Sequence, residues 1–326
     1  MEYMDVKGAG RPVSKIVMGT AGGTPGFSPD DRDVFEAMAE RYVEAGGNLF
    51  DTARFYGLRG ASEVLLADWL KKSKKRDKVF VLSKCCSPYV TSAGVQDDER
   101  SRVHPEFISE DLTVSLDKTG FEYFDFYLMH RDDRKLPVGE LLDRLEYHRG
   151  LGKIRAYGLS NWEKDRIEEA ERYCDLKGYA GISLLEPSYS LATVRAPRWP
   201  NTVYLSDEEA RYFSDKGLPI LSFSPLGGGY FAGVFFRDES RVTEGVRRAY
   251  FNDENTEKYR RALLLAEKRG SSPENIALAY IMSLDLLVAP VIGPRTVSEL
   301  LSSLGAANIR LSEAEIEYLS LRSSYV

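Results

Sequence analysis

Gly46-Gly47-Asn48-Leu49-Phe50-Asp51-Thr52-Ala53-Arg54-Phe55-Tyr56-Gly57 joins a short apolar run to a carboxylate, and a tyrosine follows five residues after that carboxylate. Asn48-Leu49-Phe50 has the composition of a buried strand, and the paired glycines before it are typical of a helix end. An acid at the end of a strand is held firmly, and a tyrosine on the next loop can fold back towards it. The segment therefore predicts a phenol close to a buried carboxylate.

Two further apolar runs also lead to an ionisable side chain. Residues 79–84 end on Lys84, and residues 124–129 are followed by His130. A phenol has an ordinary pKa near ~10, so it needs a nearby positive charge to exchange protons at neutral pH, and Lys84 supplies one. Each residue alone is typical of a cap, a solvated lysine or a packed histidine. At three consecutive strand ends, with Tyr56 just after the first, they indicate a proton-donating site.

The whole chain alternates apolar runs with segments of helical spacing. The expected strands are residues 16–19, 48–51, 79–84, 124–130, 154–160, 182–186, 219–223 and 286–292. The expected helices are residues 30–45, 62–72, 105–118, 137–149 (beginning on its proline), 163–174, 207–215, 259–268, 273–283, 297–304 and 312–321. Eight such units predict an α/β protein, a (β/α)8 TIM barrel with an N-terminal β-hairpin (4–15) and added C-terminal helices, in a single domain over residues 1–326.

A doubly wound sheet is the alternative fold. Its best phosphate-binding candidate, Gly227-Gly228-Gly229-Tyr230-Phe231-Ala232, matches G-x-G-x-x-A in spacing. It lies far from the N-terminus and is expected to lead into a long loop rather than a helix, so we interpret it as a glycine-rich loop.

In a barrel, the active site lies at the C-terminal ends of the strands. Three connections that follow such ends, residues 86–104, 188–206 and 226–255, are too long for simple turns. Because they leave the same face, we expect them to rim the mouth of the site and to cover substrate and cofactor.

Composition narrows the classes of partner. The 44 basic and 50 acidic residues give a net charge of -6, which argues against nucleic-acid and anionic-membrane surfaces. No apolar run approaches the ~20 residues of a membrane span, and the first residues do not resemble a signal peptide. Cys85, Cys86 and Cys174 have no spacing typical of metal ligands and are expected to be reduced thiols. We expect a cytoplasmic protein without a metal site.

The order of these residues resembles the aldo-keto reductase family. The resemblance rests on Gly46–Ala53, Tyr56-Gly57, Ser62-Glu63, Gly158-Leu159-Ser160-Asn161, Ser222-Phe223-Ser224-Pro225-Leu226 and Ile292-Gly293-Pro294-Arg295, and on the order Asp51, Tyr56, Lys84, His130. It extends from the hairpin to the final helix, and residues 128–133 resemble a bacterial branch. The family implies a barrel that binds a nicotinamide dinucleotide and reduces an aldehyde or ketone, such as a sugar or other small carbonyl substrate.

Carried over position by position, the resemblance gives four catalytic roles. Tyr56 is the general acid, and Lys84 lowers its pKa. Asp51 orients Lys84 through a salt bridge. His130 hydrogen-bonds the substrate carbonyl and orients it.

The resemblance also implies the cofactor contacts. Ser160, Asn161 and Glu186 are expected at the nicotinamide carboxamide, and Phe223 on its ring. Ser224 and Leu226 match pyrophosphate positions. Arg295 and Glu299 match the adenosine end. Further cofactor-binding positions are Gly19, Thr20, Gly293 and Ser303.

Two positions depart from the family pattern. Glu186 stands where most members have glutamine, so an ionised side chain there accepts from the carboxamide but cannot donate. At the adenosine end Gly293 and Glu299 replace common basic residues, which leaves Arg295 as the nearby cation. Because Arg295 can pair with a 2′-phosphate, the expected cofactor is NADP(H) rather than NAD(H).

The function expected is an NADP-dependent oxidoreductase of the carbonyl reductase type. One alternative is a non-catalytic nicotinamide-nucleotide sensor or regulatory subunit on the same barrel, although a sensor need not keep the four catalytic residues. A barrel isomerase or lyase is a second alternative, but it needs no dinucleotide contacts. The sequence does not indicate the substrate or the oligomeric state.

Overall fold

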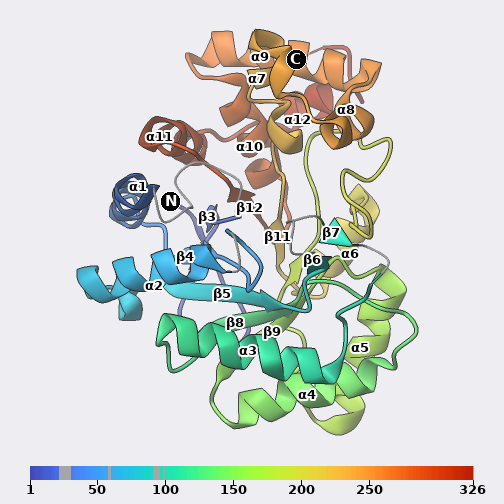
Figure 1. The fold of residues 1–326 in the computed structure, drawn as a ribbon. Coiled ribbons are helices and arrows are strands. Elements are labelled where there is room, and N and C mark those ends of the chain that lie inside the picture. Colours follow the sequence, from blue (N-terminus) through green and yellow to red (C-terminus); the bar gives the residue numbers. More distant parts are fainter. Residues whose placement is uncertain (22–30, 58–59, 91–95, 98–99, 326) are drawn as a thin grey trace.

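Eight parallel strands close into a barrel in the computed structural model, which describes residues 1–21, 31–57, 60–90, 96–97 and 100–325 (Figure 1). The strands are β3 (Val17–Gly19), β4 (Leu49–Asp51), β5 (Phe80–Cys85), β8 (Phe124–Met129), β9 (Ile154–Ser160), β10 (Leu185–Glu186), β11 (Ile220–Ser222) and β12 (Val288–Ile292). Each pairs with its neighbour in sequence order, and β12 closes onto β3. The predicted TIM barrel is confirmed.

Helices surround this barrel. They are α1 (Arg32–Glu44), α2 (Ala61–Ser73), α3 (Pro105–Thr119), α4 (Val138–Gly150), α5 (Lys164–Lys177), α6 (Asp207–Asp215), α7 (Val234–Arg237), α8 (Glu244–Tyr250), α9 (Asp253–Arg269), α10 (Pro273–Ser283), α11 (Val297–Gly305) and α12 (Glu313–Leu319). Helices α7, α8, α9 and α12 gather at one side of the molecule, at the top of Figure 1. No helix among the described residues is long and apolar enough to cross a membrane.

A hairpin packs against the interior of the barrel. Strands β1 (Tyr3–Met4) and β2 (Val13–Ser14) pair antiparallel, as expected for residues 4–15. Met4, Val6 and Val13 form one buried cluster with inward side chains of the barrel strands. This cluster fills the interior below the C-terminal ends of the strands, so a cavity can open only above it.

Alternation along the strands separates two apolar cores. In β5, Phe80 and Leu82 belong to the interior cluster, whereas Val81 belongs to the larger core under the helices. In β8 the same division holds for Phe126 and Leu128 against Tyr127. Successive side chains of a strand point to opposite faces, so this pattern also fixes which strand-end residues face inward.

The long connection 226–255 differs from the sequence-based expectation. It holds a 3-10 turn (Gly227–Gly229) followed by the short helices α7 and α8, so it is not an irregular loop. Thr243 caps α8 by accepting from the backbone N–H of Val246. Helices of four and seven residues are too short to show a clear apolar period, which is why the sequence did not indicate them.

Two smaller details also correct the expectation. Strands β6 (Tyr89–Val90) and β7 (Gln96–Asp97) pair antiparallel within the connection 86–104. Pro137 has extended backbone angles and precedes α4, so the helix begins one residue later than expected. The expected capping box of Ser312 and Glu315 is present at the start of α12.

Gly158 on β9 offers a test of barrel packing. A Cβ added there would lie 2.4 Å from the backbone oxygen of Leu184, which cannot move aside as a flexible side chain can. We expect Gly158→Ala to lower the free energy of unfolding by ~1–3 kcal/mol, the usual cost of overpacking. Urea denaturation measures it. Gly150→Ala is the control, because a Cβ there meets nothing within 4 Å. Equal stabilities of the two variants would contradict this account.

Candidate active site

Three inward positions carry charge at the C-terminal ends of their strands. Lys84 follows the inward residues Phe80 and Leu82 of β5, and Asp51 follows the inward Leu49 of β4. Glu186 of β10 follows the inward Leu184 in the same way. The period of two therefore places two acids and one base in the barrel interior, where all three are buried.

Lys84 lies at the centre of this group and is completely buried. Its Nζ forms ion pairs with Asp51 and with Oε1 of Glu186, the latter at 3.1 Å. It also donates to the backbone oxygen of Thr52 at 3.3 Å. Burial lowers the pKa of Lys84, but Asp51 and Glu186 outweigh that effect and raise it above its ordinary value. Lys84 is therefore a cation.

Tyr56 lies in the loop after β4, and its Oη is 3.2 Å from Nζ of Lys84. The predicted contact of these two side chains is therefore present. Burial raises the pKa of the phenol well above 10, although Lys84 lowers it. Asp51 and Glu186 add to the increase, so the net shift is upward rather than downward as expected. In this state Tyr56 holds its proton at neutral pH.

His130 follows β8 and faces Tyr56, with ring centroids 5.7 Å apart and ring planes at 79°. Oγ of Ser87 lies 2.9 Å from its Nδ1 and fixes the orientation of the ring. Burial lowers the pKa of His130 well below 6.5, and Arg131 and Lys84 lower it further. A neutral imidazole held at Nδ1 presents Nε2 as the remaining polar atom.

Glu186, expected at the carboxamide, also contacts the buried lysine. Its Oε1 contacts Lys84, whereas its Oε2 is buried and has no hydrogen-bond partner among the described residues. Burial raises the pKa of Glu186 to about 8, because desolvation and the nearby Asp51 outweigh the attraction of Lys84. Glu186 therefore belongs to the Lys84 cluster, an arrangement that the sequence did not indicate.

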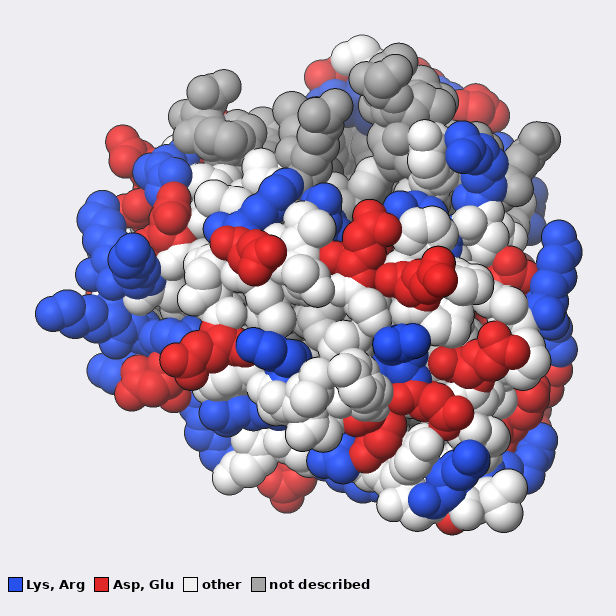
Figure 2. Space-filling model, turned by 60° about the horizontal axis from the view of Figure 1, so that its bottom comes forward, with Lys and Arg blue, Asp and Glu red and all other residues white. Residues whose placement is uncertain are grey.

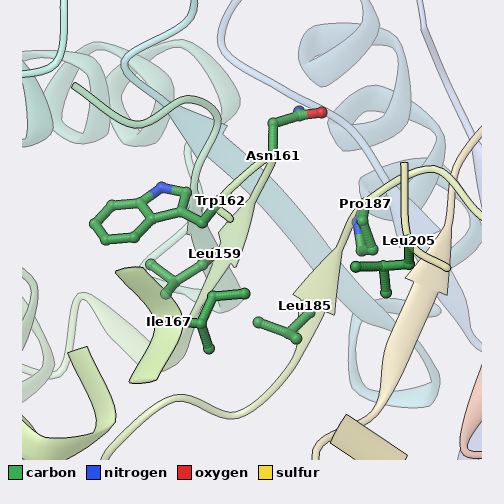
Figure 3. Close-up of a pocket in the computed structure, with 7 residues that line it drawn as sticks. All are labelled: Leu159, Asn161, Trp162, Ile167, Leu185, Pro187 and Leu205. Atoms are coloured by element: carbon green, nitrogen blue, oxygen red, sulfur yellow. The ribbon is translucent and has the colours of Figure 1, made fainter. Parts of the chain in front are cut away.

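Ser160 and Asn161, at the end of β9, hydrogen-bond within the protein. The hydroxyl of Ser160 donates to the backbone oxygen of Glu186 at 2.8 Å. The Asn161 amide donates to the backbone oxygen of His130 and to Oγ of Ser160, and it accepts from the N–H of Val203. Asn161 has φ of 58°, and Figure 3 shows its side chain pointing away from the apolar side chains around it.

A cavity of about 1000 Å³ opens above this cluster. It is lined by eleven of the twelve residues expected to bind the cofactor, namely Gly19, Ser160, Asn161, Glu186, Phe223, Ser224, Leu226, Gly293, Arg295, Glu299 and Ser303. Asp51, Tyr56 and His130 line it too, whereas Lys84 lies beneath them. The remaining residue, Thr20, is buried, and its hydroxyl donates to the backbone oxygen of Asp51.

The long connections border this cavity, as expected. Pro88 comes from the first, Arg198, Trp199 and Thr202 from the second, and several residues from the third. Which residues of these connections reach the cavity, Arg198 among them, was not predicted, because only the fold of the connections decides it. Ser87 was missed for the same reason, although it directly follows the Cys85-Cys86 pair.

The cysteines and the other metal-ligating side chains of the described residues do not gather into a candidate metal site. The three cysteines are buried and free, and no group of three metal-ligating side chains occurs in the part of the chain that the structure describes.

On the face drawn in Figure 2, basic side chains are interspersed with acidic ones, as the similar numbers of the two kinds lead one to expect.

A family model described as the Aldo/keto reductase family matches residues 15–321. The chain belongs to this family. It is similar to the uncharacterized oxidoreductase YrpG of Bacillus subtilis, with 26% identity covering 98% of this chain and 95% of that protein. It is also similar to the NADH-specific methylglyoxal reductase of Escherichia coli, with 28% identity covering 93% and 92% of the two chains. The norsolorinic acid reductase stcV of Emericella nidulans is 27% identical over 94% of this chain and 78% of that protein.

Membership of the aldo/keto reductase family supports an oxidoreductase that acts on carbonyl compounds with a nicotinamide cofactor. The cavity fits such a group. Its volume is at the upper end of the range for ordinary ligand sites. Its wall includes Gly293, and a Cβ added there would meet nothing within 4 Å. Glu186 has a buried oxygen without a hydrogen-bond partner in the described structure.

The lowered pKa of His130 predicts a neutral ring. We expect its ¹⁵N NMR signals to remain those of neutral imidazole as the pH falls from 8 to ~5.5, where an ordinary histidine is mostly protonated. His130→Gln assigns the signals by their loss. Because the unfolded chain protonates at a higher pH, His130 stabilises the fold above ~6.5 and loses that effect as the pH falls. Protonation with a midpoint near ~6.5 would contradict the assignment.

Proposed function

We propose that this protein reduces an aldehyde or ketone to an alcohol with NADPH, and that Tyr56 is the proton donor. One observation carries the proposal: Oη of Tyr56 lies 3.2 Å from the buried cation Lys84, at the wall of a cavity that His130 also lines. This arrangement places a protonated phenol and a neutral imidazole at the wall of the same cavity. Both can donate to an oxygen on which negative charge develops.

The roles of the side chains follow from their surroundings. When bound, the nicotinamide supplies a hydride to the carbonyl carbon. Tyr56 and His130 stabilise the carbonyl oxygen, and Tyr56 transfers its proton to that oxygen. Lys84 stabilises the phenolate that remains, because its charge lies 3.2 Å away. Asp51 holds Lys84 in place through their ion pair. One preorganised donor of this kind is typically worth ~10²–10³ in rate.

The cofactor residues would hold the dinucleotide along the cavity. Phe223 would support the nicotinamide ring, Ser224 and Leu226 would meet the pyrophosphate, and Arg295 would meet the adenosine end. Glu299 accepts from the backbone N–H of Arg295 at 2.7 Å, and we assign the guanidinium of Arg295, at the cavity wall, to a 2′-phosphate. A relative named NADH-specific argues for testing this preference directly. The substrate we propose is a small carbonyl compound.

Tyr56→Phe tests the proton donor. The change removes the hydroxyl and keeps the ring, so we expect dinucleotide binding to survive and carbonyl reduction to fall by at least ~10², the scale of a lost general acid. Fluorescence titration with NADPH measures the first, and cofactor oxidation with a panel of aldehydes and ketones measures the second. Near wild-type turnover in the variant would refute the role. Binding of NADPH by the wild type without turnover of any carbonyl would favour a nucleotide sensor.

Arg295→Ala tests the cofactor preference. A charge-assisted contact to a 2′-phosphate is worth ~1.5–3 kcal/mol, so we expect the dissociation constant of NADPH to rise about tenfold or more while that of NADH changes little. Arg310→Ala is a suitable control, because Arg310 donates to the backbone oxygen of Met282 and does not line the cavity. Equal losses for the two cofactors would exclude the assignment.

A further inference from the structure

Glu186 and Lys84 form a contact that crosses the barrel. Strand β10 carries Glu186 and strand β5 carries Lys84, and two strands lie between them in the closed sheet. Oε1 of Glu186 lies 3.1 Å from Nζ of Lys84, and Asp51 binds the same nitrogen. The exposed fractions are 0% for Lys84, 2% for Glu186 and 3% for Asp51, so water screens these charges only weakly.

The net charge of Lys84, Asp51 and Glu186 together decides how this cluster titrates. With both carboxylates ionised, one lysine faces two negative groups, and the cluster carries a net charge of -1. Such an excess is costly when buried, so one carboxyl favours its protonated form. Glu186 is the better candidate, because its Oε2 is buried without a hydrogen-bond partner among the described residues, and the residue itself lines the cavity.

We propose that Glu186 is a positioning residue whose proton regulates the charge that the buried cluster presents to Tyr56. The protonated acid leaves Lys84 paired with Asp51 alone, and its O–H can donate into the cavity. After the proton leaves for solvent through the cavity, the second negative charge offsets the effect of Lys84 on the phenol. Tyr56 then becomes a weaker acid.

The groups around Glu186 act in opposite directions, and the balance favours the protonated acid. Lys84 on β5 and Arg131 after β8 favour the carboxylate, whereas burial and Asp51 on β4 favour the acid and outweigh them, so the pKa of Glu186 rises to about 8. Tyr56 lies near enough for ionised Glu186 to raise its pKa. His130 is neutral. The neighbouring strands β9 and β11 have no acidic side chain, and Arg155 of β9 is exposed.

The first experiment follows the carboxyl itself in the protein without added cofactor. With glutamate labelled at ¹³Cδ, we expect one signal to titrate with a midpoint near pH 8 and to be absent from Glu186→Gln and Glu186→Asp. The exposed Glu208 on α6 supplies the control variant Glu208→Gln, which keeps that signal. A midpoint near the ordinary ~4.3 would overturn the proposal. So would loss of a pH 8 signal from Glu208→Gln alone.

The second experiment uses stability. Between pH ~5 and 7 the folded protein keeps a proton on Glu186 that the unfolded chain has released, so stability falls as the pH rises towards 8. The loss is at most about tenfold in the folding equilibrium constant per pH unit. We expect Glu186→Gln to remove this decline relative to wild type, and Glu208→Gln to leave it in place. Parallel stability curves for wild type and Glu186→Gln would overturn the assignment.

The third experiment concerns catalysis and rests on the proposed function. We expect kcat/KM for carbonyl reduction by the wild type to decline above pH ~8, and this decline to be absent in Glu186→Gln and restored, with a shifted midpoint, in Glu186→Asp. A merely structural role would lower both profiles without changing their shape, and that result would overturn the proposal. If no carbonyl is reduced at all, the proposed function fails, and the first two experiments still decide the charge state of Glu186.

Discussion

The burial of Lys84 is the constraint on which the rest of the site depends. An ammonium with no exposed surface is tolerated only because acidic partners compensate its charge, and here Asp51 on β4 and Glu186 on β10 both contact it. Removing one partner of a buried pair typically costs ~3–5 kcal/mol, so the cluster restricts both strands. The position of Tyr56 follows, because its hydroxyl is held by the same nitrogen.

This arrangement suits a proton donor better than a simple lowering of the phenol pKa would. Burial keeps Tyr56 protonated, and Lys84 is already in place for the charge that appears when the proton leaves. The neutral His130 adds a second donor without adding a positive charge that would compete with Lys84. In the reaction proposed for this protein, the barrel thus prepares the charge distribution of the product-forming step before substrate arrives.

The sequence was sufficient for the barrel and for the contacts of Asp51, Lys84 and Tyr56, because strand period and strand ends are local properties of the chain. It was insufficient for Glu186, whose partner depends on which residues face each other across the closed barrel. It also missed α7 and α8, whose four and seven residues show too little periodicity. Ser87 was missed because its contact with His130 depends on the course of the chain after β5.

The cross-barrel contact of Glu186 has a consequence for the order in which the protein is made. Lys84 and Asp51 lie in the first third of the chain, whereas Glu186 follows about a hundred residues after Lys84. During synthesis the lysine therefore meets its first carboxylate early and its second only after β10 has left the ribosome. Before β10 is synthesised, Asp51 is the one carboxyl of this cluster with which Lys84 can pair. The final protonation state of the site is thus set late, when the barrel closes.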